Sequence, residues 1–204
     1  MAEPLQHGRA FRSLPRADLS LAAITALDPG QRERLFSAVA RLYSELEIEL
    51  EALPRPCTAC GACCRFGQHG QRLYASAPEM AYVFSENPPI PRADGADTCV
   101  YLTPEGRCGA RARRMLGCRT YYSGHTRTEA ARAQEIHERY LGLLKKLCRN
   151  HGLGWNYADC MAFYAEQREA PHNPLAQSPE LRGVHHYEDP TAPLSAEDWP
   201  EEYR

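Results

Sequence analysis

Cys57-Thr58-Ala59-Cys60-Gly61-Ala62-Cys63-Cys64 places four thiols within eight residues, and three more cysteines follow at positions 99, 108 and 118. Thiolates bind soft metals strongly, and closely spaced thiolates are the ligands of structural zinc and of iron–sulfur clusters. The run therefore predicts a domain whose loops are held together by bound metal.

The segment before this run predicts a long helix. Asp28 can cap its N-terminus, Pro29 suits the first helical position and Gln31 completes a capping box. Pro54 and Pro56 are expected to end the helix just before the first cysteine. Its apolar positions recur at steps of three and four, as one buried face requires: Leu35, Val39, Leu42, Leu46, Leu50 and Leu53.

The segments after the run predict a mixed but mainly helical fold. Residues 71–75 suit a short strand, and Ser76-Ala77-Pro78-Glu79 opens a helix through a capping box. Residues 99–110 contain a tight-turn sequence and predict a small β-hairpin with one cysteine on each arm. Thr126-Arg127-Thr128-Glu129 opens a long amphipathic helix, and residues 155–163 suit a strand or turn followed by a helix.

The fold class that follows is α+β and predominantly α-helical, a small metal-stabilised single domain with a short β-hairpin. A chain of 204 residues with 43% hydrophobic residues can bury one core. We expect an irregular N-terminal segment over 1–17 and a cysteine-cluster domain over 18–168 with its core motif at 55–122. The Pro-rich tail over 169–204 is expected to be disordered or draped over the domain.

Composition points to neither a membrane nor a nucleic-acid partner. The net charge is −2 and the pI about 6.4, so no global field attracts nucleic acid. No apolar run approaches the ~18 residues of a membrane span. The N-terminus lacks a secretory h-region, so we expect a cytoplasmic protein with reduced thiols. A disulfide framework is the alternative, but nine cysteines cannot pair completely, and neighbours such as Cys63 and Cys64 are poorly placed to bridge.

The cysteine spacing departs from the standard cluster motifs. Cys57, Cys60 and Cys63 follow the ferredoxin pattern, but its fourth position is Gly67, where a radical-SAM pattern would also need cysteine. Adjacent thiolates chelate one metal with strain, so Cys63 and Cys64 are expected to serve two metals. Two tetrahedral metals that share one thiolate need seven ligands, which predicts a dinuclear site on Cys57, Cys60, Cys63, Cys64, Cys99, Cys108 and Cys118.

Two other arrangements stay open. One is a single four-cysteine site whose leftover thiols are completed by His69, His125 or substrate, and the other is a four-iron cluster on four of the seven cysteines. Zinc and iron both accept tetrahedral thiolate, so the sequence predicts a zinc or iron cofactor without separating them. Cys148 and Cys160 fall on expected helices and are interpreted as small buried hydrophobes, while His137 and His151 are interpreted as surface or core residues.

Arginines follow the later cysteines. Residues 107–132 contain seven arginines against one acid, Glu129. They can hydrogen-bond and neutralise metal thiolates, hold an anionic substrate or RNA phosphate, or form a solvated helix face. The groups expected around the ligands are Arg114, Arg119, Tyr121, His69 and His125.

These motifs resemble the YkgJ-type cysteine-cluster family, described as zinc- or iron-chelating domains. The matching elements are Cys57 to Cys64, Cys99-Val100-Tyr101-Leu102 with Gly106-Arg107-Cys108, and Cys118-Arg119-Thr120-Tyr121. The family's usual Arg-Pro is Arg114-Met115 here. The resemblance implies metal chelation by the matching cysteines, with Arg119 and Tyr121 as companions.

Three functional classes follow. The first is a metal-binding module that acts through an unidentified protein partner or substrate. The second is an Fe–S oxidoreductase or electron carrier, a name that some relatives in the family carry. The third is a methyltransferase-like enzyme or accessory subunit, since flagellin lysine N-methylases contain a similar cysteine motif. No G-x-G-x-x-G loop after a strand and no Walker A loop accompanies the cysteines.

Overall fold

The computed structural model describes residues 21–53, 60–70, 72–87, 98–121 and 126–169. The expected N-terminal segment, nearly all of the expected C-terminal tail and residues 88–97 lie outside the described residues, as do Cys57 and His125. None of the described helices is long and apolar enough to cross a bilayer.

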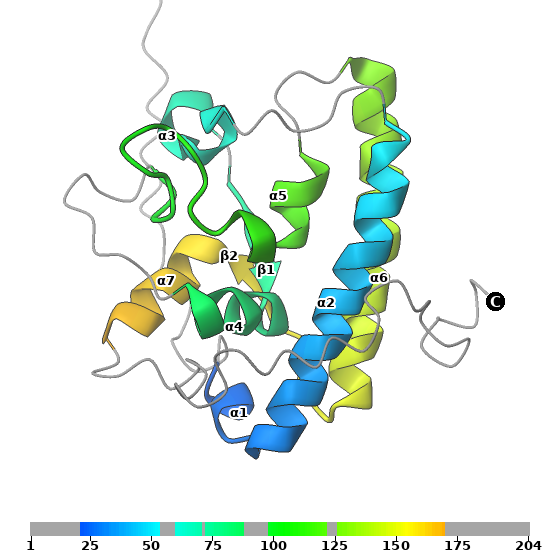
Figure 1. Ribbon diagram of the computed structural model, residues 1–204, viewed down its shortest axis with the longest axis vertical. Helices are drawn as coiled ribbons and strands as arrows, with labels where there is room; N and C mark the ends of the chain where they lie inside the picture. The colour runs from blue at the N-terminus through cyan, green and yellow to red at the C-terminus, as the bar shows by residue number, and fades with distance from the viewer. Residues whose placement is uncertain (1–20, 54–59, 71, 88–97, 122–125, 170–204) are drawn as a thin grey trace, which may run out of the picture.

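Two long antiparallel helices form one side of the molecule, α2 (Pro29–Glu51) and α6 (Arg127–Asn150) (Figure 1). Both begin at the predicted capping boxes, at Asp28 and at Thr126. The predicted apolar face of α2 is confirmed, because Leu35, Val39, Leu42, Leu46 and Leu50 are all buried. The α2 stripe therefore forms the main wall of the hydrophobic core.

A two-stranded antiparallel sheet joins distant parts of the chain beside these helices. Strand β1 (Tyr74–Ser76) pairs with β2 (Tyr157–Asp159), with Ala75 opposite Ala158. Each strand leads directly into a helix, β1 into α4 (Ala77–Glu86) and β2 into α7 (Cys160–Glu169). Because the strands are antiparallel, α4 and α7 leave from opposite ends of this small sheet.

The predicted hairpin at 99–110 is reduced to one antiparallel bridge around a turn, with the Gly109 N–H donating to the Tyr101 carbonyl at 2.7 Å. Thr103 N–H donates to the Arg107 carbonyl at 2.7 Å, and a single bridge joins Leu102 to Cys108. A 3-10 turn, η3 (Arg111–Arg113), and a short helix, α5 (Leu116–Thr120), follow it. The cysteine run itself continues into a 3-10 turn, η2 (Ala62–Cys64), and the one-turn helix α3 (Phe66–His69).

Four elements meet at the buried carboxylate of Glu79, which is 1% exposed. One carboxylate oxygen accepts from the Tyr43 hydroxyl of α2 and from the Leu116 N–H that begins α5, both at 2.8 Å. The other accepts from the backbone N–H and hydroxyl of Ser76, both at 2.7 Å, which completes the predicted capping box of α4. Burial raises the pKa of Tyr43 well above its usual range, so its hydroxyl stays a donor.

Replacing Glu79 with Gln should destabilise the fold strongly. The glutamine side chain has one oxygen that accepts and one N–H₂ group that donates. The N–H₂ group would face buried donors that now bond to the second carboxylate oxygen, and those donors would be left unpaired. We expect the free energy of unfolding to fall by about 2–4 kcal/mol in urea titrations followed by circular dichroism. Glu33→Gln, at an exposed position on α2, is the matched control. Equal unfolding free energies for the two variants would contradict this role.

Candidate metal centre

Six of the nine cysteines lie in one region of the described structure, and they come from four separate segments. Cys63 and Cys64 are on η2, Cys99 and Cys108 flank the turn before η3, Cys118 is on α5 and Cys160 begins α7. Their thiols are close enough to change one another's pKa values. The chain thus gathers thiols that are up to a hundred residues apart.

Backbone contacts hold the first two segments together. Cys99 N–H donates to the Cys64 carbonyl at 2.8 Å. Gly61 adopts a left-handed conformation with φ 69°, and a Cβ there would collide with the Gly106 carbonyl oxygen. This approach requires glycine at 61 both for its φ and for its missing side chain. The glycine in the cysteine run is therefore a packing requirement of the site.

The pKa values of four of these thiols are raised, which favours their neutral form. Hydrogen bonding to Cys63 lowers the pKa of Cys64, but a hydrogen bond with Cys99, burial and the neighbouring thiols outweigh it and raise the pKa to about 12. Burial is the leading cause of the raised pKa values of Cys108, Cys118 and Cys160. A metal ion must displace these protons, because thiolate is the ligand.

The described thiols do not by themselves make a closed ligand cage. No three of the His, Cys, Asp or Glu side chains in the described ranges form a group that could hold a metal ion. Cys60 is exposed, and Cys57 and the side chain of His69 lie outside what the structure describes. The predicted seven-cysteine ligand set stays a prediction, with five of its members in the gathered group.

Cys160 is a fully buried core residue, as predicted, and it also lies beside the other thiols. Its thiol interacts with Cys64 and Cys118, and its N–H donates to the Leu73 carbonyl at 2.8 Å. Cys148 remains apart, with Glu79 and Arg149 as its charged neighbours. The two cysteines are equally buried and look alike in the sequence, so only the β1–β2 pairing distinguishes them.

Tyr164 accompanies Cys160 one turn further along α7, on the same helix face. Its hydroxyl is fully buried and has no partner of ordinary hydrogen-bond geometry within the described residues, although it lies close enough to the Cys160 thiol to lower that thiol's pKa by hydrogen bonding. Tyr101 and Phe84 contact its ring edge-on, with ring centroids 5.6 and 5.8 Å away. Burial, then the thiols of Cys99, Cys160 and Cys118, raise the pKa of Tyr164, so a fixed hydroxyl donor faces the thiol region.

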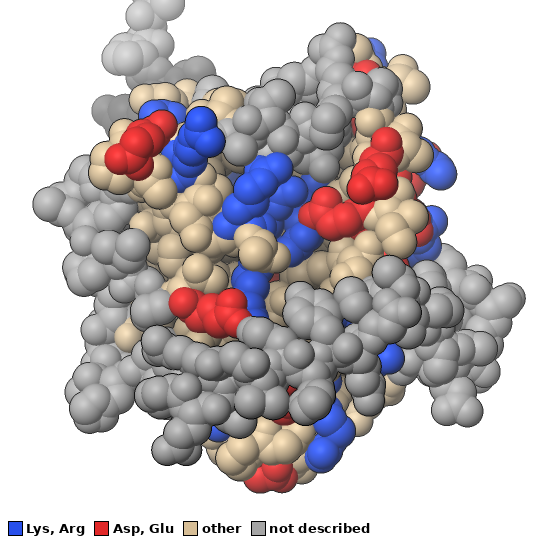
Figure 2. All heavy atoms as spheres, in the orientation of Figure 1, with Lys and Arg blue, Asp and Glu red and all other residues tan. Residues whose placement is uncertain are grey.

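The arginines near the cysteines serve different purposes. Arg119 stacks 4.2 Å above the Tyr43 ring, pairs with Glu47 and donates to the Arg114 and Ala112 carbonyls. It therefore ties α5 to α2, and these contacts involve no thiol. Arg114 lies near Cys108 and partly offsets the rise of its pKa, while its guanidinium is 3.6 Å from Glu47. Figure 2 shows a group of basic side chains in the middle of one face, with acidic side chains beside it.

A cavity of about 440 Å³ opens beside the thiols. This volume lies within the range of small-molecule sites. Cys63, Cys64, Cys99 and Cys118 contribute to its wall, and Tyr121, expected near the ligands, also lines it. The remaining lining is mostly apolar and aromatic: Phe66, Leu73, Tyr74, Gly117, Ala130, Ala133 and Tyr157, with Arg72, Thr120, Gln134 and His137 as polar members.

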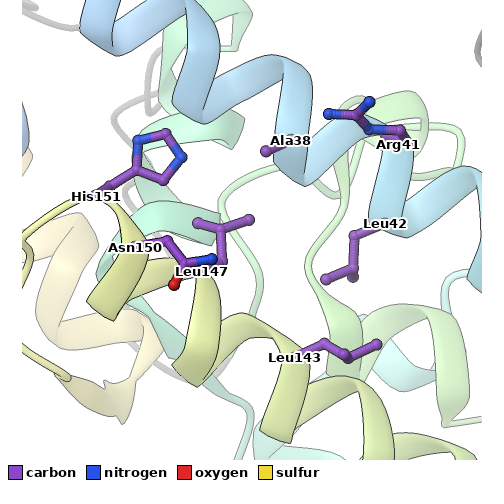
Figure 3. A pocket seen from close by; sticks show the side chains of 7 residues that line it. All are labelled: Ala38, Arg41, Leu42, Leu143, Leu147, Asn150 and His151. Atoms are coloured by element: carbon purple, nitrogen blue, oxygen red, sulfur yellow. The ribbon is translucent and has the colours of Figure 1, made fainter. Parts of the chain in front are cut away.

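A second hollow, of about 80 Å³, lies between α2 and α6 (Figure 3). Leu42, Leu143 and Leu147 form its floor, and Arg41, Asn150 and His151 lie at its edge. Burial lowers the pKa of His151. The hollow is too small for an organic ligand and contains no thiol, so the cavity beside the cysteines is the better candidate for binding.

Comparison of the chain with family models, curated proteins and solved structures finds no match. The resemblance to the YkgJ-type family therefore stays a prediction that rests on the cysteine motifs.

Gly61→Ala should disrupt the site and the fold together. A left-handed alanine costs about 1–2 kcal/mol, and the collision with the Gly106 carbonyl adds to it. We expect urea denaturation to show a loss of at least about 2 kcal/mol. Gly142→Ala is the control, because it has open space within α6 and should stabilise by about 0.5–1 kcal/mol. Wild-type stability in Gly61→Ala would contradict the packing argument.

Proposed function

We propose that the protein binds zinc or iron, with an iron–sulfur cluster as one form of the iron, through its gathered cysteines. The observation that supports this most is the proximity of six thiols from four separate segments. Soft, tetrahedral metals are the partners that a set of thiolates selects.

Two further features fit such a metal. Metal binding would convert buried thiols to thiolates, which are stronger hydrogen-bond acceptors, and the Tyr164 hydroxyl lies beside Cys160 and Cys99 as a donor for them. Arg114 lies close enough to Cys108 to offset part of the negative charge that ionised thiols would bring. Cys57 and Cys60, from the same run, are the ligands that would complete the set.

Metal analysis of matched variants tests the proposal. We expect anaerobically purified protein to contain zinc or iron, Cys160→Ala to lose at least half of it, and Cys148→Ala to keep it. Both replaced thiols are fully buried, so the comparison separates ligation from packing. The metals are quantified by elemental analysis together with acid-labile sulfide. Metal-free wild-type protein would sink the proposal, and equal metal content in both variants would remove Cys160 from the site.

A second candidate is chemistry on a small substrate, as an Fe–S oxidoreductase or a methyltransferase-like enzyme. The cavity beside the thiols favours it, because a metal held only for structure needs no ligand-sized opening. Here we expect brown protein whose visible absorption is bleached by dithionite, or turnover of S-adenosylmethionine. Colourless protein that contains only zinc and leaves S-adenosylmethionine unchanged would count against both.

A further inference from the structure

His137 is a residue of the cavity wall whose hydrogen-bonding state follows from its neighbours. It lies on α6, half-buried, with Nδ1 2.9 Å from the Thr120 hydroxyl of α5. The same hydroxyl lies 3.1 Å from the Leu116 carbonyl, one helical turn earlier. A hydroxyl has a single proton, and in helices threonine donates it to such a carbonyl.

Thr120 therefore accepts from His137, and the ring carries its proton on Nδ1. Burial lowers the pKa of His137, although the charges of Glu138 and Glu79 act in the opposite direction. A neutral imidazole protonated at Nδ1 has a lone pair on Nε2. His137, one of the lining residues, can therefore accept a hydrogen bond at Nε2, and its ring is held by the Thr120 hydroxyl of α5.

The remaining wall suits an apolar body. Phe66, Leu73 and Ala133 are buried or partly buried apolar residues, and the Tyr157 ring lies 5.9 Å from that of Tyr74 at the same cavity. Aromatic side chains favour flat apolar ligands, and one well-placed polar group then sets orientation. The volume of about 440 Å³ accommodates such a molecule.

We propose that this cavity binds a small aromatic or largely apolar molecule that donates an O–H or N–H to Nε2 of His137. Binding of this molecule requires only the cavity and His137, whether or not a metal is bound. Its placement next to a reactive centre rests on the proposed metal function. Thr120 is a positioning residue, since it fixes the ring without lying at the donor's end.

Phenol and anisole are a matched pair of probes, because they share a ring and an oxygen but only phenol has a hydrogen to donate. We expect the full-length protein as purified to bind phenol about fivefold more tightly than anisole, the difference that one neutral hydrogen bond provides. His137→Leu should weaken phenol to the level of anisole and leave anisole unchanged. Thr120→Val should lower phenol affinity less, since it frees the ring without removing it. Calorimetric titration measures the affinities of the wild-type protein and of the two variants for both probes.

Two further measurements keep the inference falsifiable where a variant folds poorly. Long-range nitrogen–proton NMR of the wild-type ring should show His137 protonated at Nδ1, and a proton on Nε2 would overturn the proposal. Ala133→Phe, which fills the cavity from α6, should abolish binding of both probes. Equal affinities for phenol and anisole, or unchanged phenol binding in His137→Leu, would also overturn it.

Metal content measured on the same samples separates this inference from the proposed function. Metal-free protein that still prefers phenol through His137 would refute metal binding and support the cavity. Metal-loaded protein without a preference for phenol would support metal binding and refute the role of the cavity.

Discussion

The buried carboxylate of Glu79 is the interaction on which the arrangement of the helices depends. Its two oxygens accept four hydrogen bonds, from Tyr43 of α2, the first N–H of α5 and two groups of Ser76 at the start of α4. A carboxylate accepts only, so each of these donors is satisfied without competition. Removing it from water is unfavourable unless every acceptor site is used, which explains why the donors come from three separate elements. The polar hub thus specifies how the helices meet, while the apolar stripe of α2 supplies most of the burial.

Two arginines extend this hub to the segment that follows Cys108. Arg113 stacks 4.4 Å above the Tyr82 ring, donates to the Ser85 hydroxyl at 2.7 Å and pairs with Glu86. Arg119 makes the corresponding contacts with Tyr43 and Glu47. Cation–π contacts and charge-assisted hydrogen bonds allow a guanidinium to be buried without loss of its charge. The abundance of arginine, read from the sequence as metal or anion chemistry, thus serves helix packing at these two positions.

Features that depend on neighbouring residues were predictable, and those that depend on distant pairing were not. The capping boxes at Asp28, Ser76 and Thr126 lie where the sequence predicts them, because each is decided within four residues. The β1–β2 pairing joins segments on either side of α6, and no local pattern encodes which short strand pairs with which. The interpretation of Cys160 as a buried side chain holds, but its approach to Cys64 was not predictable, since it depends on that pairing. Helix α5 is too short to show an apolar period in the sequence, so it was not predicted. The role of His137 was not predictable either, because it depends on the contact that α5 makes through Thr120.

Helix α5 is therefore where stability and chemistry meet. Within five residues it receives the Glu79 carboxylate at Leu116, presents the Cys118 thiol and orients His137 through Thr120. Gly117 permits this, because a Cβ there would lie 2.5 Å from a Leu73 methyl group that lines the same cavity. A helix this short has little stability of its own, so its position follows from the contacts at its two ends. The fold therefore fixes the Cys118 thiol and the His137 imidazole on this side of the cavity. The geometry of the thiols in the cysteine run would instead be defined by a bound metal.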